Sequence, residues 1–310
     1  MADWQPTATP AALRARASLL AQIRSFFASA GVLEVATPVL ARHGVSEVHI
    51  DSIAVPGHGF LQSSPEYHMK RLLAAGSGPI YQISPAFREG EAGERHNREF
   101  TLLEWYRPGF TLPRLIDECL ALLQPILEPA AVEHWRFRQL FRQHTGLDPL
   151  TAPIEALTAC TRATELPPLD RAALVDWLMA TVVEPALPKT ALTVVRDFPG
   201  WAAALARRHQ DSDGEWLAAR FELYCGGLEL ANGYHELNDA AEQAARFAAD
   251  NQHRARLHKP VMEADPALLA ALHHGLPDCA GVAIGLERLL MVQLGASDIA
   301  EVLSFPAARA

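Results

Sequence analysis

Residues 86–106 read AFREGEAGERHNREFTLLEWY and predict two strands joined by a long polar loop. Because side chains alternate along a strand, one face of the second strand carries Phe100, Leu102, Glu104 and Tyr106. Such a face suits a cleft that stacks a base at one end and holds a cation at the other; the alternative is a solvated sheet face. Arg88 ends the first strand, where its guanidinium can bind a phosphate or pair with a nearby glutamate on the surface.

A second constellation is FELYCGGLELANGYHEL at 221–237, which predicts a hairpin about Gly226 and Gly227. A two-residue turn places Tyr224 opposite Glu229, so Glu222 lies diagonally across from Glu229 on the same face, ~7–8 Å away at Cα. Two carboxylates so placed repel each other unless a cation lies between them. Mg²⁺ bridging nucleotide phosphates fits this pair, and two solvated glutamates are the alternative.

A third segment, GVAIGLERLLM at 281–291, predicts a strand that leads into a helix. Gly285 permits close backbone approach at the junction, and Arg288 lies in the first turn of the helix. Free backbone N–H groups and the helix dipole favour an anion at such a position.

The rest of the chain predicts an α+β fold, with an antiparallel sheet flanked by helices. We expect a loose arm over residues 1–10 and a largely helical insertion over 111–190. Apolar spacing predicts a helix over 11–30, followed by a strand over 31–40 with Pro38 near its end. A helix is predicted within 61–76, another helical stretch over 240–271, and a tight turn at 232–233.

The composition, with 49% hydrophobic and 20% charged residues among 310, is typical of a globular protein. A net charge of −9 argues against a general surface for polyanions, which are held mainly by Lys and Arg. The four cysteines form no CxxC pair, so neither a disulfide framework nor a zinc site is predicted. The start of the chain has no apolar signal core, and no apolar run is long enough to span a bilayer, so we expect a cytoplasmic protein.

The three segments GVLEVATPVL (31–40), 86–106 and 281–291, in this order, resemble motifs 1, 2 and 3 of class II aminoacyl-tRNA synthetases. GGLELANGYHELND (226–239) is similar to the lysine branch of that family. Within it, the chain resembles the truncated paralogs that ligate (R)-β-lysine onto a lysine of elongation factor P, because motif 1 begins close to the N-terminus and Ala283 stands where tRNA-charging relatives usually have glycine. The resemblance implies one catalytic domain over residues 1–310 without an anticodon-binding domain, and a homodimer through the motif 1 strand. Ala283 by itself also fits a neutral packing residue.

The resemblance implies a role for each site residue. The phosphates of ATP would be held by Arg88 and Arg288, which are also the catalytic residues. The remaining ATP-binding residues would be Glu89, Gly90, Asn97, Phe100, Glu229 and Leu230, with Phe100 stacked on adenine. Mg²⁺ would be bound by Glu222 and Glu229. The amino acid would be surrounded by Ser64, Pro65, Glu66, Glu104, Tyr106, Asn232, Glu236 and Ala283.

The carboxylates of Glu66, Glu104 and Glu236 suit a doubly cationic diamino acid, since a neutral amino acid would leave them unpaired in a closed site.

Three positions differ from the usual family pattern. Gly90 stands where motif 2 usually has glutamate, Arg98 replaces a common proline, and Glu287 replaces a common aspartate.

We therefore expect an enzyme that uses ATP and Mg²⁺ to activate lysine or (R)-β-lysine as an adenylate and to ligate it to a lysine ε-amine on elongation factor P, without tRNA and away from membranes. The alternatives are a lysyl-adenylate-forming enzyme that charges a tRNA-like acceptor, and a non-catalytic regulatory module with a synthetase-like fold. His96 and His235 are candidates for a general base, or histidines without a catalytic role.

Overall fold

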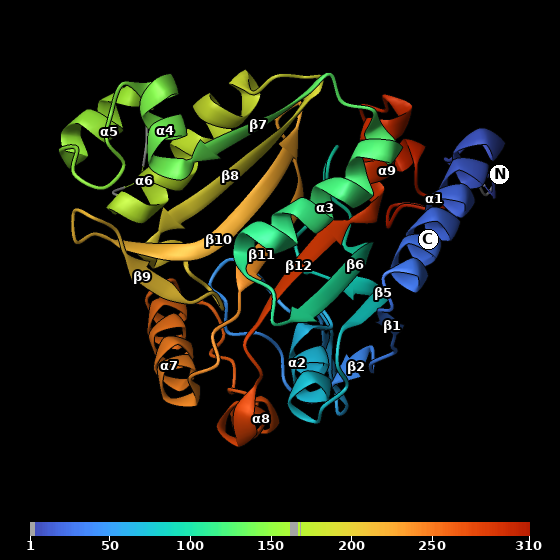
Figure 1. The fold of residues 1–310 in the computed structure, drawn as a ribbon, viewed down its shortest axis with the longest axis horizontal. Helices are drawn as coiled ribbons and strands as arrows, with labels where there is room; N and C mark the ends of the chain where they lie inside the picture. Colours follow the sequence, from blue (N-terminus) through green and yellow to red (C-terminus); the bar gives the residue numbers. More distant parts are fainter. Residues whose placement is uncertain (1–3, 162–166, 168) are drawn as a thin grey trace. The chain divides into compact units, whose positions relative to one another are not determined.

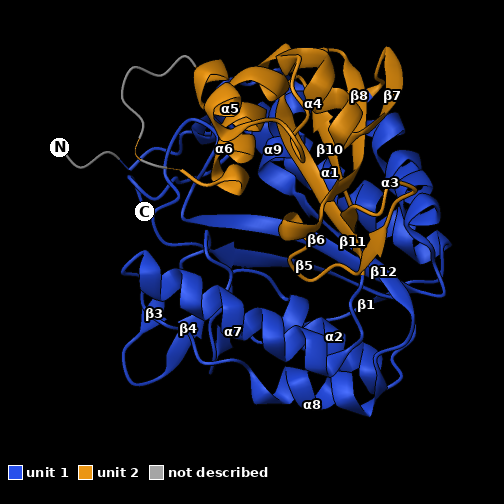
Figure 2. Ribbon diagram, turned by 90° about the vertical axis from the view of Figure 1, so that its left-hand side faces the viewer, with its two compact units in different colours: residues 1–127, 236–310 blue, residues 128–235 orange. Residues whose placement is uncertain are grey.

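The computed structural model describes residues 4–161, 167 and 169–310. The chain folds as two compact units, residues 1–127 with 236–310 and residues 128–235 (Figure 2). Each unit has its own sheet strands and helices and is described by itself. That the chain forms one catalytic domain stays a prediction.

The first unit is built on an antiparallel core of three strands, β5 (Ile80–Phe87), β6 (Glu99–Pro108) and β12 (Cys279–Gly285). β6 is the central strand and pairs with both neighbours, while the short β1 (Leu33–Glu34) runs parallel to β5. Together with the helices around it, this sheet confirms the predicted α+β class. The side chains in the middle of β6 are buried, so the alternative of a solvated sheet face does not hold for them.

Two groups of helices flank this sheet (Figure 1). One group contains α1 (Pro10–Ser29), α3 (Leu112–Leu127) and α9 (Leu286–Leu294). The other contains α2 (Glu66–Ala74), α7 (Ala240–Arg256) and α8 (Pro266–Gly275). Phe27 of α1 stacks on Tyr81 with ring centroids 4.4 Å apart and meets Trp105 edge-on at 5.2 Å, which anchors α1 on the sheet.

The strand expected over 31–40 is wrong in length. Only β1 pairs with the main sheet, and β2 (Leu40–Ala41) joins a separate small sheet with β4 (Gly59–Leu61) and β3 (Ala54–Val55). Pro38 lies between the two pieces, where its missing N–H prevents a continuous ladder.

The N-terminal arm, residues 1–10, was expected to be loose, and its described part differs from that expectation. The backbone N–H groups of Thr7 and Ala8 donate to carbonyls of the C-terminal segment at 3.0 and 3.1 Å.

The second unit contains the strands β7 (Ala131–Arg136), β8 (Ala191–Pro199), β10 (Trp216–Cys225) and β11 (Leu228–His235), with β9 (Arg208–Gln210) beside β10. β7 and β8 are parallel, and β10 pairs antiparallel with β8, β9 and β11. This sheet is covered by α4 (Phe137–Thr145), α5 (Ile154–Cys160) and α6 (Arg171–Leu178). A π-helix at Met179–Val183 and a 3-10 helix at Glu184–Ala186 follow α6, and another 3-10 helix at Gly200–Ala202 follows β8. The core between them includes Phe141, Leu174 and Tyr224.

The helical expectation for 111–190 holds for α3, α4, α5 and α6, but β7 interrupts it. Residues 162–166 and 168 of that range lie outside the described residues. The tight turn expected at 232–233 is also wrong, because both residues lie within β11. Gly233 is needed there for a different reason, since a Cβ at this position would collide with the ring of Phe221.

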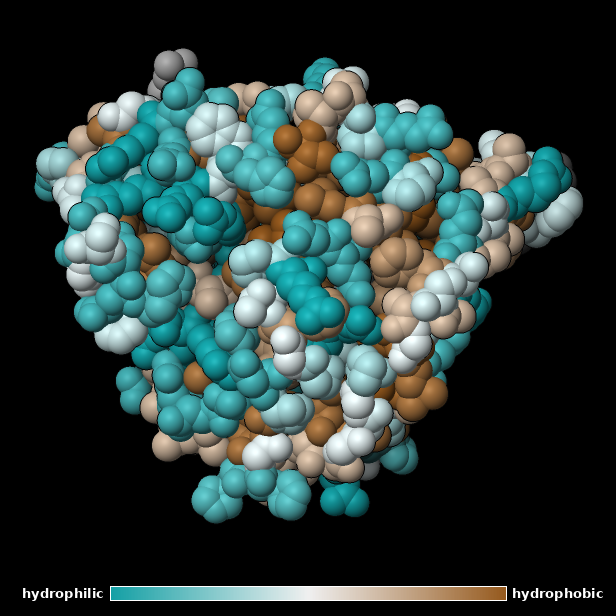
Figure 3. Space-filling view, viewed as in Figure 1, coloured by the Kyte–Doolittle hydropathy of each residue, from teal (hydrophilic) through white to brown (hydrophobic). Residues whose placement is uncertain are grey.

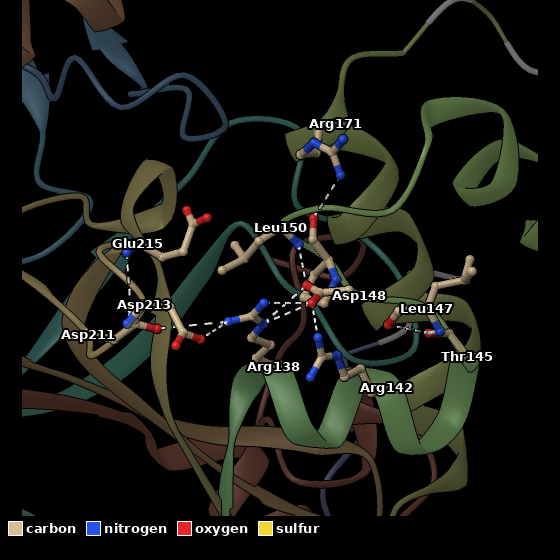
Figure 4. A network of polar contacts seen from close by, with 11 residues as sticks. Arg138, Arg142, Thr145, Leu147, Asp148, Leu150, Arg171, Asp211, Asp213 and Glu215 are labelled. Atoms are coloured by element: carbon tan, nitrogen blue, oxygen red, sulfur yellow. Dashed lines mark hydrogen bonds and ion pairs between the residues drawn. The ribbon is translucent and has the colours of Figure 1, made fainter.

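An ion-pair network joins α4 to the loops of the second unit (Figure 4). Arg138 donates to Asp148 from Nε at 3.0 Å and from Nη2 at 2.7 Å, and its Nη1 lies 3.2 Å from Asp213. Arg142, one helical turn along, pairs with the same Asp148. Burial opposes the charge of Asp148, but the hydrogen bonds and charges of these arginines outweigh it and lower the pKa of Asp148 to about 2.

Hydrophilic residues cover much of the face drawn in Figure 3, with hydrophobic residues exposed in places. Within the described ranges, no helix combines the length and apolar character needed to cross a membrane.

Candidate active site

Two acidic side chains of the first unit meet around a buried lysine. Glu66 begins α2, and Lys70 lies one turn further along the same helix face. The Nζ of Lys70 is 2.7 Å from Oε1 of Glu66 and 2.7 Å from Oε2 of Glu236. Lys70 and Glu236 are each only 1% exposed. The structure therefore brings Glu66 and Glu236 together, as expected for a pocket that binds cations, and places an ammonium group of the chain itself between them.

Glu104 on β6 is the third carboxylate, and two hydroxyl groups hold it. The hydroxyl of Tyr106 donates to Oε1 at 2.5 Å, and the hydroxyl of Ser64 donates to Oε2 at 2.8 Å. Ser64 also accepts from the backbone N–H of Glu66 at 3.0 Å, so one serine links the carboxylate on β6 to the start of α2. Pro65, between them, is buried and holds the turn. These contacts orient Glu104 in a fixed position.

The charge state of Glu104 depends on its burial. Burial and then the negative charge of Glu66 raise the pKa of Glu104 to about 8, and Glu236 adds to this, although the hydrogen bonds from Tyr106 and Ser64 oppose it. Burial raises the pKa of the Tyr106 hydroxyl well above its usual value, and the nearby carboxylates raise it further. Tyr106 thus remains a neutral donor, and Glu104 takes up a proton near neutral pH when no cation faces it.

Strand β12 forms the wall beside this cluster. Ala283 pairs with Glu104 and Gly281 pairs with Tyr106 across the β6–β12 ladder. A Cβ on Gly281 would collide with the Tyr106 ring and lie 2.7 Å from Oε1 of Glu236, so only glycine leaves room for both groups. Side chains opposite each other in an antiparallel pair share a face. The methyl group of Ala283 is therefore expected on the face of the sheet that carries Glu104, and its role in the substrate pocket stays a prediction.

The predicted nucleotide residues of motif 2 lie further along β6 and in the loop before it. The guanidinium of Arg88 lies over the ring of Phe100, with Cζ 5.0 Å from the ring centroid. Nη1 of Arg88 is also 3.4 Å from Oε1 of Glu91, so the surface ion pair left open as an alternative is present. Arg88 thus lies against Phe100, whose side chain is on the same face of β6 as Glu104.

Arg288 reaches the same loop from the first turn of α9. Its Nη2 lies 2.6 Å from Nε2 of His96, and its Nε donates to the backbone carbonyl of Arg95 at 3.4 Å. The motif 3 arginine and the motif 2 loop are therefore in contact. Because His96 is a direct neighbour of Arg288, it can orient this guanidinium.

The other predicted loop residues differ in how firmly they are held. Glu89 is half-exposed and lies 4.0 Å from Arg98, and Gly90 has a positive φ of 79° that favours glycine over the usual glutamate. Asn97 is buried, donates to the carbonyl of Glu99 at 2.6 Å and accepts from the backbone of Ala307 at 3.0 Å. The side chain of Asn97 therefore holds the loop in place through backbone contacts.

A buried ion pair that was not predicted from the sequence joins the motif 2 and motif 3 segments to α1. Glu287 is 2% exposed and accepts from the backbone N–H of Thr101 at 2.8 Å and from Arg16 of α1 at 3.0 Å. Arg16 also donates to the Thr101 hydroxyl at 2.7 Å. Thr101 follows Phe100 and Glu287 precedes Arg288, so this contact fixes both nucleotide residues relative to each other. An acidic residue next to Arg288 was the only signal of it in the sequence.

The hairpin of the second unit has the predicted turn and a bulge that was not predicted. Tyr224 pairs with Glu229 and Cys225 with Leu228, as expected. The register then shifts, so that Glu222 pairs with Asn232 and Leu230 becomes the extra residue. Without the shift, Asn232 would point away from Glu229. The bulge brings Glu222, Glu229 and Asn232 onto one face of the ribbon.

Glu222 is buried and firmly held, so the alternative of a solvated glutamate is wrong for this residue. Arg220 and Tyr224 both donate to its carboxylate, and the amide of Asn232 donates at 3.4 Å. Burial raises the pKa of Glu222 to about 7; the charge of Arg220 opposes this and the charge of Glu229 adds to it. The effect of the Glu229 charge on Glu222 fits a pair that shares a cation.

This pair fits Mg²⁺, which usually binds one or two carboxylates and completes its shell with water and phosphate oxygens. Among the described residues there is no group of three or more His, Cys, Asp or Glu side chains that could hold a metal without such help.

Comparison with known proteins gives a consistent result. The family model for class II tRNA synthetases (D, K and N) matches residues 1–309. The chain is 48% identical to a protein of Mannheimia succiniciproducens named "Elongation factor P--(R)-beta-lysine ligase", over 97% of both chains. It is 46% identical to a protein of the same name from Pasteurella multocida, over 98% of this chain and 97% of that protein, and 45% identical to one from Edwardsiella ictaluri, over 100% and 99%. With its three motif segments and this match along almost its whole length, the chain belongs to the class II tRNA synthetases of the D, K and N group.

Proposed function

We propose that this protein is an ATP-dependent ligase that activates (R)-β-lysine, or lysine, as an aminoacyl-adenylate and transfers it to the ε-amine of a lysine on elongation factor P. The observation that carries the proposal is the acidic cluster, formed by Glu66, Glu104 and Glu236. Three carboxylates in a closed site disfavour a neutral amino acid and favour one with two ammonium groups. The relatives from Mannheimia succiniciproducens and Pasteurella multocida, which are named as ligases of (R)-β-lysine and elongation factor P, support the same substrate and acceptor.

On the amino acid side, Ser64, Pro65 and Glu66 form the wall that meets the amine next to the carboxyl group. Glu104 and Glu236 face the other amine, with Tyr106 as a neutral hydroxyl donor to Glu104. The further contacts of the substrate are Asn232 and Ala283. Since every carboxylate of the cluster is already oriented by a partner, binding a dication requires little rearrangement of the site.

On the nucleotide side, Phe100 stacks on adenine while Arg88 and Arg288 neutralise the phosphates. The motif 2 loop with Glu89, Gly90 and Asn97 borders the base, and Glu229 and Leu230 lie beside the nucleotide. Glu222 and Glu229 would hold Mg²⁺, which would supply charge neutralisation for the phosphates. The substrate carboxylate attacks the α-phosphate and pyrophosphate leaves, a step that depends on alignment and charge more than on a protein nucleophile.

In the second step the ε-amine of the acceptor lysine attacks the adenylate carbonyl, and AMP leaves. The amine must lose a proton, and His96 and His235 are the candidates for a base. His96 contacts Arg288, which favours an orienting role for His96 over proton transfer.

We further propose that the protein acts in the cytoplasm as a homodimer, without tRNA. Leu33 and Leu40 of the motif 1 segment are 57% and 44% exposed, and covering such apolar side chains in a dimer is favourable. The oligomeric state can be measured by light scattering.

The proposal is tested by mass spectrometry of elongation factor P after incubation with the enzyme, ATP and each lysine isomer. The expected result is a mass gain on one lysine of the factor, larger with (R)-β-lysine than with lysine, and none when ATP is omitted. Transfer to total tRNA instead of the factor would favour the tRNA-like acceptor. Absence of pyrophosphate exchange with either isomer would favour a non-catalytic module and overturn the proposal.

A further inference from the structure

Lys70 is a cation enclosed within the acidic cluster. It is 1% exposed, and within the described residues Nζ forms ion pairs with Glu66 and with Glu236, each at 2.7 Å. The two carboxylate oxygens it contacts are therefore no more than twice 2.7 Å apart. Two negative charges at such a separation in a buried site repel strongly. Burial disfavours the charged form of Lys70, but the charges of Glu236 and Glu66 outweigh this and raise its pKa.

The charges of the cluster match the proposed substrate only when Lys70 is included. Glu66, Glu104 and Glu236 carry three negative charges when ionised, and Lys70 subtracts one. Two negative charges remain, and a diamino acid has two ammonium groups once its carboxylate is joined to AMP. A buried site binds best when its charges are balanced, because an unpaired buried charge is costly.

We propose that Lys70 is a positioning and specificity-determining residue that holds Glu66 and Glu236 in place and sets the net charge of the amino acid pocket to match a doubly cationic substrate. The inference rests on the proposed function, since it concerns the same pocket. Lys70 acts through the two glutamates and does not itself take part in adenylate formation.

The surroundings of Lys70 support a charge role over simple packing. The ionisable groups that face it are Glu66 from its own helix and Glu236 from the segment before α7; Glu104 and Tyr106 on β6 face these carboxylates. Asp265 at the start of α8 acts on Tyr67 and His68 of α2 instead. A hydrophobic side chain of the same length would fill the volume but leave Glu66 and Glu236 without their shared counter-charge.

The first test compares Lys70→Met with Lys189→Met in pyrophosphate exchange. Lys189 is exposed, so its variant removes the same charge from the surface and serves as the matched control. We expect Lys70→Met to raise KM for the diamino acid about 30-fold or more, with KM for ATP changed by less than about threefold. Lys70→Arg keeps the charge and should recover part of this loss. Lys189→Met should behave like the wild type.

A second test separates charge from packing by chemical rescue. Lys70→Ala leaves a space that matches propylammonium, so binding of lysine is measured by calorimetry with added n-propylamine or n-propanol. ATP is omitted, so that no adenylate can react with the added amine. Rescue by the amine and not by the alcohol is expected.

Each outcome has a distinct meaning. If wild-type enzyme activates neither lysine isomer, the proposed function fails and the inference with it. If wild-type enzyme is active and folded Lys70→Met keeps the wild-type ratio of the two KM values, only the role of Lys70 is refuted. Equal rescue by alcohol and amine, or no rescue of folded Lys70→Ala by either, likewise overturns the charge role. Circular dichroism establishes that each variant is folded.

Discussion

Binding of the substrate ammonium should require ionised Glu104, so KM for the amino acid should depend on pH. The pKa of Glu104 is raised to about 8 by burial and by the charges of Glu66 and Glu236. Below that pH the free enzyme carries a proton on Glu104, and the substrate must displace it. Each pH unit below the pKa then weakens binding about tenfold. Between about pH 8.5 and about pH 6.5, KM for lysine or (R)-β-lysine should rise about 25-fold.

The assay is pyrophosphate exchange at saturating ATP across this pH range, with KM for ATP measured in parallel. Glu104→Gln is neutral at every pH, so its KM should be high and nearly independent of pH. Glu118→Gln is the matched control, because Glu118 contacts Trp105 and Arg107, which alternate with Glu104 and Tyr106 on β6. That variant should keep the wild-type slope. A flat KM in the wild type, or an unchanged slope in Glu104→Gln, would refute the reasoning.

The same residue should limit stability. A carboxyl group whose pKa is higher in the folded state than the usual value of 4.5 holds its proton more tightly when folded. The contribution of Glu104 to the free energy of unfolding is therefore lost as pH rises from the unfolded pKa of 4.5 through the folded pKa of about 8. Glu104→Gln should raise the unfolding temperature of the substrate-free enzyme at about pH 8.5 more than at about pH 5. Differential scanning calorimetry at the two pH values measures this difference.

Three further predictions concern other parts of the molecule. Arg288→Ala should abolish pyrophosphate exchange without changing the circular dichroism spectrum, since it removes a phosphate-binding charge from the surface of α9; normal exchange would exclude Arg288 from the reaction. Ala283→Gly removes a methyl group beside Glu104 and should shift the ratio of kcat/KM values toward lysine over (R)-β-lysine by about fivefold; an unchanged ratio would make Ala283 a packing residue only. Asp148→Asn should destabilise the protein by about 1–2 kcal/mol at neutral pH in urea unfolding. The pKa of Asp148 is lowered to about 2 in the folded protein, so its contribution to the free energy of unfolding is present above the unfolded pKa of 3.8 and is lost as pH falls through about 2. If Asp148→Asn destabilised the protein equally at neutral pH and at about pH 2, the ion pair with Arg138 would not be the cause.

Local patterns in the sequence predicted the elements that carry the site. Alternation along β6 placed Phe100, Glu104 and Tyr106 on one face, and the Gly226-Gly227 pair predicted the hairpin turn and the pairing of Tyr224 with Glu229. Both features depend on residues close together in the chain, so strand geometry alone decides them.

Other features could not be predicted this way. The bulge in β11 moves Asn232 to the face of Glu222, and no residue type in that strand marks it. In the sequence, the only signal of the contact between Lys70 and Glu66 is their spacing of one helical turn, which is typical of a surface ion pair on any helix. Its burial depends on what packs over α2, and that contact comes from a distant part of the chain.

The sequence by itself determined the strands of motif 2, the strand and helix of motif 3, the order of the motifs and the presence of enough glutamates to bind a dication. Only the tertiary structure decided that Glu66 from a helix and Glu236 from a distant segment meet at one ammonium group, and that Glu104 is buried beside Tyr106 and Ser64. The physical reason is that periodicity follows from backbone geometry within a few residues, whereas burial, charge pairing and the resulting pKa values depend on which distant segments pack together.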